Sequence, residues 1–285
     1  MSNLICYIGL FGAGKSFALV QRTIELAQKN KLMIVSNLWF DVRCYSEYCL
    51  QMGYRWANKC RLLYVDLLLG KLIDMRSRRV MADDADVNMM LSYPNSVILF
   101  DEGGIHLNAR FWKNTGKEFL SSLFQLRHDN KTLLCGYQFF DQVDKQLREV
   151  IQLVVECSSI SPRDALGCPR MAVSFRHYYE PLRYSKIAFE NPSGLQRWLW
   201  ALKVEYNFFT VTNILYFLKR KKPHPQQLVF KIYDSFVPAK RKKFRPYLVW
   251  VDPVDVVDSV DVADTSLDCF DLLLQQSKEY GIIKK

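Results

Sequence analysis

The sequence lacks any cysteine pattern that would indicate a disulfide framework or a zinc site. It has eight cysteines in 285 residues and no C-x-x-C pair. A chain of this length with 49% hydrophobic residues can bury a core without disulfides. Cys44, Cys49 and Cys60 are close in sequence, but their spacing fits no zinc-binding pattern. We therefore expect reduced, unligated thiols, as in a cytosolic protein.

Long apolar runs and a secretory leader are also missing. The most membrane-like stretch, residues 206–218, has thirteen residues, whereas a transmembrane helix needs about 20. The N-terminal sequence has no basic region ahead of its apolar residues, as a signal peptide would have. We expect residues 206–218 to form a buried or interfacial element, and we expect no signal peptide.

Short apolar runs alternate with helical patterns over the first 160 residues. We predict strands at 5–9, 32–37, 97–100, 132–138 and 151–157, and helices at 16–30, 116–128 and 141–150. Strands that alternate with helices favour parallel pairing. The sequence therefore predicts an α/β fold with a mainly parallel sheet.

The pattern divides the chain into three segments. We expect a core at 1–160 with an inserted lobe at 41–92, a β-rich extension with basic runs at 161–246, and an acidic linker with a short amphipathic tail at 247–285. The extension is expected to contain short β-like runs at 171–179 and 228–236.

The net charge of +10 is concentrated in one part of the chain. Residues 219–246 hold ten Lys or Arg and one acid, whereas residues 247–285 hold eight acids and three Lys. The basic runs KRKK (219–222) and KRKKFR (240–245) suit the phosphates of nucleic acid or an anionic membrane face. A pair of solvated loops is the alternative interpretation. We expect DNA to bind at these two runs.

A glycine-rich motif follows the first predicted strand and precedes the first predicted helix. Residues 9–16, GLFGAGKS, satisfy G-x-x-x-x-G-K-[ST], the Walker A motif. In such a motif the backbone N–H groups surround phosphate oxygens, while Lys15 reaches the β- and γ-phosphates and the Ser16 hydroxyl binds Mg²⁺. The expected nucleotide-binding residues are Gly9, Gly12, Ala13, Gly14, Lys15, Ser16 and Phe17.

The predicted strand VILF (97–100) is followed by two acids, as in a Walker B motif. Asp101 is expected to hold the magnesium ion together with Ser16, because this strand and the P-loop should end at one edge of the sheet. Glu102 is expected to polarise the attacking water. This second acid favours hydrolysis over a kinase-like transfer, since a kinase must exclude water.

Two further polar residues are candidates for catalysis. Gln138 ends the strand at 132–138, where it either senses the γ-phosphate and orients water or caps a loop. Arg127 closes the helix before that strand. It is either an arginine finger for a neighbouring subunit's nucleotide or a cation that stabilises the helix C-terminus. Arg110 and Arg148 are weaker candidates for the finger.

Motifs of other nucleotide-binding classes are absent. No N-K-x-D element for guanine is present, because Asn58-Lys59 and Asn130-Lys131 lack the acid that should follow. No L-S-G-G-Q signature is present either, which argues against a transporter cassette. Adenine is therefore the expected base, and ATP with Mg²⁺ the expected cofactor pair.

Five segments in order resemble the zonular occludens toxin (Zot)-like family. They are GLFGAGKS, VILFDEGGIHLNAR, LRHDNKTLLCGYQ, VDKQLRE and KIYDSF, and the resemblance covers about residues 1–236. That family includes the filamentous-phage assembly ATPases and is related to the FtsK-HerA pumping ATPases. The chain departs from it after KIYDSF, where a basic run and an acidic spacer stand in place of a membrane span and an exported domain.

The resemblance implies a RecA-like P-loop ATPase that works as a homo-oligomeric ring in the host cytoplasm. It would move phage DNA in virion assembly, export or genome packaging, with capsid or assembly proteins as partners and contacts to the inner membrane or the virion. The departure raises the packaging role. The alternative is a membrane-docked assembly scaffold that binds ATP and acts mainly through its basic runs and tail. A small-molecule kinase is disfavoured by Glu102 and the basic tail.

Overall fold

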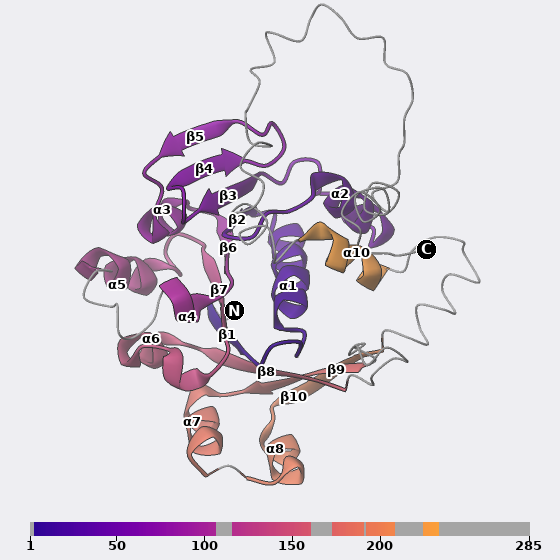
Figure 1. The fold of residues 1–285 in the computed structure, drawn as a ribbon, viewed down its shortest axis with the longest axis vertical. Coiled ribbons are helices and arrows are strands. Elements are labelled where there is room, and N and C mark those ends of the chain that lie inside the picture. The colour runs from indigo at the N-terminus through magenta and orange to yellow at the C-terminus, as the bar shows by residue number, and fades with distance from the viewer. Residues whose placement is uncertain (1–2, 107–115, 161–172, 191, 209–224, 234–285) are drawn as a thin grey trace, which may run out of the picture. The chain divides into compact units, whose positions relative to one another are not determined.

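A computed structural model describes residues 3–106, 116–160, 173–190, 192–208 and 225–233 (Figure 1). The chain divides into two compact units, residues 1–238 and 239–285, and the described residues all belong to the first. This first unit is built on one ten-stranded sheet, with the strands in the order β10-β9-β8-β1-β7-β6-β2-β3-β4-β5. The strands are β1 (Leu4–Ile8), β2 (Met33–Ser36), β3 (Leu62–Asp66), β4 (Lys71–Asp74), β5 (Val80–Asp83), β6 (Ser96–Phe100), β7 (Thr132–Tyr137), β8 (Leu153–Ile160), β9 (Val173–Tyr179) and β10 (Lys203–Phe208).

The middle of the sheet is parallel and both of its ends are antiparallel. Strands β8, β1, β7, β6, β2 and β3 pair in parallel. At one end β9 and β10 continue the sheet in antiparallel fashion, and at the other β4 and β5 do so. The parallel strands all end at one edge of the sheet, called the carboxyl edge below, and begin at the opposite amino edge.

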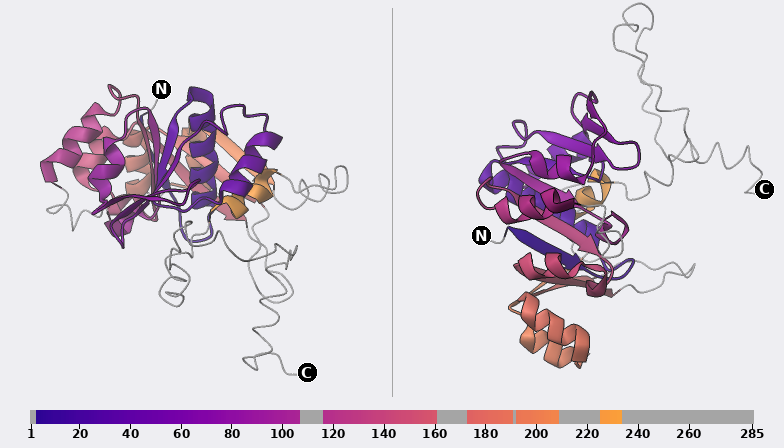
Figure 2. Two further views of the ribbon diagram at one scale, coloured as in Figure 1. Left: turned by 90° about the horizontal axis from the view of Figure 1, so that it is seen from above. Right: turned by 90° about the vertical axis from the view of Figure 1, so that its left-hand side faces the viewer.

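Helices cover both faces of the sheet (Figures 1 and 2). Helices α1 (Lys15–Asn30), α2 (Val42–Gln51) and α10 (Pro225–Ile232) pack on one face, and α3 (Val87–Ser92), α5 (Gly116–Gln125), α6 (Lys145–Val150) and α7 (Pro181–Glu190) on the other. Two further α-helices are short, α4 (Gly103–His106) and α8 (Gly194–Trp200), and a 3-10 helix, η2 (Phe140–Gln142), follows β7.

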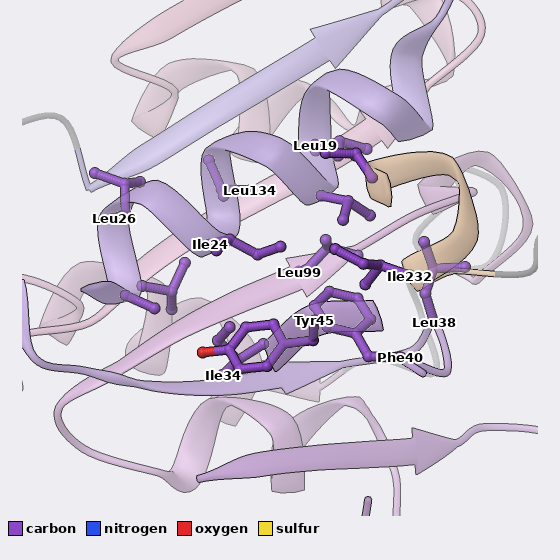
Figure 3. Close-up of a cluster of buried hydrophobic side chains, with 14 of the residues drawn as sticks. Leu19, Ile24, Leu26, Ile34, Leu38, Phe40, Tyr45, Leu99, Leu134 and Ile232 are labelled. Atoms are coloured by element: carbon purple, nitrogen blue, oxygen red, sulfur yellow. The ribbon is translucent and has the colours of Figure 1, made fainter. Parts of the chain in front are cut away.

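Side chains alternate between the two cores along each strand. On β1, Ile5 and Tyr7 join the core under α1, whereas Leu4 and Cys6 join the core on the other face. Figure 3 shows the first core, in which Leu19 and Ile24 of α1 lie over Leu99 of the sheet. Burial on both faces explains why the central strands are continuous apolar runs. The expected α/β fold with a mainly parallel sheet is confirmed.

Two further segments lie outside the five strands that were predicted for the core. Residues 41–92, expected as an inserted lobe, contribute β3, β4 and β5 to the same sheet. The β-like run predicted at 228–236 is wrong over its described part, because α10 occupies Pro225–Ile232. Its Leu228, Val229 and Ile232 are buried at helical spacing against α1 and α2.

Several predicted features lie outside the described residues. They include the basic runs at 219–222 and 240–245, the acidic segment at 247–285, and Arg110. Residues 209–218 of the membrane-like stretch at 206–218 are outside as well, whereas residues 206–208 belong to β10. Within the ranges that the structure describes, no helix has the length and apolar character needed to cross a bilayer.

Candidate nucleotide site

The glycine-rich segment forms a tight loop between β1 and α1. Gly12 and Gly14 have φ angles of 76° and 83°, in the left-handed region that side chains with a Cβ rarely adopt. A Cβ on Gly9 would lie 2.7 Å from the Cys157 carbonyl oxygen, so β8 leaves room only for glycine there. The Ser159 hydroxyl, also on β8, donates a hydrogen bond of 3.0 Å to the Gly12 carbonyl. The loop is thus held against β8.

The central contact of the site joins this loop to β6. The Ser16 hydroxyl donates a hydrogen bond of 2.5 Å to Asp101 Oδ2. Asp101 directly follows β6 and is 2% exposed, and Lys15 at the first position of α1 is 9% exposed. The sequence prediction that the two motifs meet at one edge of the sheet is therefore realised in the geometry.

Asn37, which sequence reasoning did not select, fixes the backbone of Asp101. Its side-chain amide donates to the Asp101 carbonyl at 2.8 Å, and its Oδ1 accepts from the Asp101 N–H at 2.8 Å. Asn37 follows β2, the neighbour of β6 in the sheet. The available signal was its position, because a polar residue after a buried parallel strand lies at the carboxyl edge.

Gly136, also not selected from sequence, makes the approach of the two motifs possible. It lies on β7, the strand between β1 and β6. A Cβ at this position would lie 2.5 Å from Asp101 Oδ1 and 3.4 Å from Lys15 Cε. The glycine thus provides the space in which the carboxylate and the ammonium stem sit side by side.

Glu102 is exposed next to this buried pair. Its φ angle of 56° is unusual for a residue with a side chain, and its N–H donates to Asp101 Oδ1 at 3.0 Å. The pKa of the Glu102 carboxyl is raised above its ordinary value, first by partial burial and then by the Asp101 carboxylate, while Lys15 partly offsets the rise. The next two positions leave little room for a side chain. A Cβ on Gly103 would lie 2.6 Å from the Tyr137 ring, and a Cβ on Gly104 would lie 2.8 Å from Gln142 Oε1.

The structure places the other two predicted catalytic residues at opposite edges. Gln138 directly follows β7 at the carboxyl edge and is half-buried, beside the site. The adjacent loop is capped by Gln142, whose Oε1 accepts from the Phe139 N–H at 3.4 Å. Arg127 lies between α5 and β7, at the amino edge. The six residues of β7, which rise about 3.3 Å each along the strand, separate Arg127 from the P-loop of its own chain.

Comparison with known proteins gives a family and several similar solved structures. The profile described as zonular occludens toxin (Zot) matches residues 4–197. The N-terminal domain of zonular occludens toxin from Neisseria meningitidis has 12% identity, with coverage of 82% of this chain and 100% of that chain, and a TM-score of 0.42. No curated protein matches the sequence.

The second similar structure is the genome packaging NTPase B204 from Sulfolobus turreted icosahedral virus 2 in complex with ATP-gammaS. It has 12% identity and a TM-score of 0.38, and the alignment covers 63% of this chain and 93% of that chain.

Proposed function

The chain belongs to the Zot family, and from that premise we propose that it is a phage ATPase that couples ATP hydrolysis to DNA translocation in virion assembly, export or genome packaging. The observation that carries the proposal is the 2.5 Å contact between the Ser16 hydroxyl and the Asp101 carboxylate, beside Lys15 at the start of α1. A hydroxyl, a carboxylate and an ammonium group converge there at a helix N-terminus, which is the donor set for a magnesium-bound triphosphate.

The residues present fit a magnesium ion. Ser16 and Asp101 supply oxygen ligands, which a hard cation prefers, and Mg²⁺ commonly takes only one or two protein ligands together with phosphates and waters. When bound, the ion would neutralise the negative charge of the phosphates. The Ser16 hydroxyl donates directly to Asp101, so the two side chains already occupy neighbouring positions.

The P-loop would bind the phosphates through its backbone and Lys15. Gly12 and Gly14 adopt left-handed conformations, which allow successive N–H groups to face one side of a loop. The sixteen-residue helix α1 adds the partial positive charge of its N-terminus. Lys15 is fixed at the base of this loop, where its ammonium group can stabilise the negative charge of the β- and γ-phosphates.

Glu102 is the proposed base that orients and deprotonates the attacking water. Its raised pKa makes the carboxylate a better proton acceptor than an ordinary Glu. Gln138 is proposed to contact the γ-phosphate or the water from β7. Arg127 lies at the amino edge, opposite the P-loop edge of its own chain, so as an arginine finger it would serve a neighbouring subunit in a ring.

The remaining partners are part of the same proposal. DNA would contact the basic runs at 219–222 and 240–245, capsid or assembly proteins would bind the ring, and the chain would act in the host cytoplasm with peripheral contact to the inner membrane or the virion.

The test is the ATPase rate of the full chain with and without single- and double-stranded DNA, together with its native mass. We expect DNA-stimulated turnover that Lys15→Ala abolishes, with Lys29→Ala, an exposed lysine at the other end of α1, as the matched control. Turnover that survives Lys15→Ala would overturn the assigned site. Turnover that responds to a small acceptor molecule and not to DNA would instead indicate a kinase.

A further inference from the structure

A cluster of cations lies at the amino edge of the sheet, away from the candidate nucleotide site. It comes from two segments, residues 54–61 before β3 and residues 74–79 around the turn after β4. Because β3 and β4 are antiparallel, with Leu63 opposite Asp74, the start of β3 and the end of β4 meet at this edge. The two segments hold six Lys or Arg and one acid, Asp74.

Hydrogen bonds tie the two segments together. The Arg76 guanidinium donates to the Ala57 carbonyl at 2.5 Å and to the Cys60 carbonyl at 3.1 Å. Asp74 Oδ1 accepts from the backbone N–H groups of Arg76 and Ser77 at 2.9 and 3.1 Å, which closes the turn. The cluster is therefore carried by a defined backbone.

The six cations form a surface that we call the β4–β5 basic surface. All six are exposed, and the set is Arg55, Lys59, Arg61, Arg76, Arg78 and Arg79. Arg61 approaches the Asp74 carboxylate at 4.0 Å. Over the residues that the structure describes, Arg55, Arg78 and Arg79 make no side-chain hydrogen bond or ion pair. Their charge is thus not neutralised by the described part of the chain.

We propose that the β4–β5 basic surface binds the phosphate backbone of nucleic acid. Five of its six cations are arginines, whose planar guanidinium groups pair with phosphate through two parallel hydrogen bonds. Its one Trp, Trp56, is half-buried with Lys59 Nζ 5.9 Å from the ring centroid. The choice of nucleic acid as the polyanion rests on the proposed function.

The composition of the surface favours nucleic acid over a lipid membrane. A peripheral membrane site combines cations with exposed apolar side chains that enter the acyl region. Within residues 54–61 and 74–79 no large apolar side chain is exposed, since Met75 is 1% exposed and Tyr54 and Trp56 are half-buried. The neighbouring Met81 is 46% exposed, and its sulfur accepts from the Arg61 guanidinium at 3.1 Å. The contact is therefore of the electrostatic kind that phosphate backbones make without reading sequence.

The test removes four cations that do not hold the segments together. The full-length variant carries Arg55→Ala, Lys59→Ala, Arg78→Ala and Arg79→Ala, and its binding to a labelled duplex oligonucleotide is measured by fluorescence anisotropy over a series of salt concentrations. We expect an affinity loss of about tenfold or more at low salt. The slope of log affinity against log salt should fall by up to about 0.9 for each phosphate that the variant no longer neutralises.

A charge-matched control separates the surface from net charge. Lys145, Arg183, Lys186 and Lys203 are exposed cations of α6, α7 and β10. Replacing these four with Ala removes the same charge and should leave affinity and slope near those of the wild type. Equal losses in the two variants, or no loss in the first, would overturn the proposal.

Two further measurements keep the result decisive. Binding to anionic phospholipid vesicles should be unchanged in the first variant, and a loss of vesicle binding with intact DNA binding would assign the surface to a membrane. Circular dichroism checks the fold, and Arg78→Ala with Arg79→Ala, confined to one turn, is the smaller variant if the larger one misfolds. The proposed function fails on a different result, namely wild-type turnover that does not respond to DNA.

Discussion

The two edges of the sheet use charge in opposite ways. At the carboxyl edge, Lys15 and Asp101 are buried, and the Asp101 carboxylate accepts from the Ser16 hydroxyl of α1 and from the Glu102 N–H. At the amino edge, Arg78 and Arg79 are exposed on a turn. Buried charges interact strongly and are little screened, so each must be held in place, whereas exposed charges act through their number and are screened by salt. The first arrangement suits chemistry on one phosphate, and the second suits contact with many.

The largest effect is expected where a single carboxylate performs the chemistry. Glu102→Gln removes the proposed base and should lower kcat by a factor of about 10² to 10⁴ with ATP binding retained. Because the pKa of Glu102 is raised, wild-type kcat should fall as the pH drops, starting at a higher pH than for an ordinary Glu. The variant should lack this acidic limb. A pH profile of kcat checks both, and an unchanged limb in the variant would assign the base elsewhere.

A methyl group in the middle of the carboxyl edge should have the next largest effect. In Gly136→Ala the added Cβ would lie 2.5 Å from Asp101 Oδ1, so the carboxylate must move. A displacement on the order of 1 Å costs about 10²-fold in rate. The control is Gly194→Ala, where a Cβ meets nothing within 4 Å. Steady-state ATPase rates measure the difference, and equal rates for the two variants would contradict the described role of Gly136.

Asn37→Ala should weaken the site less, because it removes a support of Asp101 and not the carboxylate. Two hydrogen bonds of 2.8 Å are lost, and we expect about a tenfold loss of kcat and about 1–3 kcal/mol of unfolding free energy. Asn88→Ala, which removes one exposed hydrogen bond to Asp86, is the control. If Asn37→Ala leaves the magnesium dependence of the ATPase unchanged, Asn37 does not position Asp101.

The central sheet and the motif residues were predictable because their signals are local. Buried parallel strands are short apolar runs, and the P-loop is a contiguous motif. Asn37 and Gly136 were not found, since their roles arise only once β2 and β7 take their places beside β6. A similar cause explains why α10 was not predicted as a helix. Phe230 stacks on Phe17 at 4.7 Å, a contact between segments more than two hundred residues apart.

The apolar run at 62–73, inside the expected inserted lobe, was not divided into strands from the sequence, and the reason is different. It contains two strands and a turn, in which Asp66 Oδ1 accepts from the N–H groups of Leu68 and Leu69, and Gly70 has a φ of 63°. The turn is made by these two residues inside an otherwise apolar sequence, so that hydrophobicity alone does not separate β3 from β4. The basic surface was missed with it, because its two segments become neighbours only through that hairpin.

The smallest expected effect is a difference in unfolding free energy between two arginine variants of the amino edge. Arg76→Ala loses hydrogen bonds to the Ala57 and Cys60 carbonyls and should cost about 1–2 kcal/mol of unfolding free energy. Arg79→Ala removes no described side-chain hydrogen bond or ion pair and should change stability by less than about 0.5 kcal/mol. Both should keep the DNA-independent ATPase rate of the wild type, since neither touches the carboxyl edge. Chemical denaturation measures the two stabilities, and equal values would mean that Arg76 does not join the segments. A reduced basal ATPase rate in either variant would show instead that the two edges are coupled.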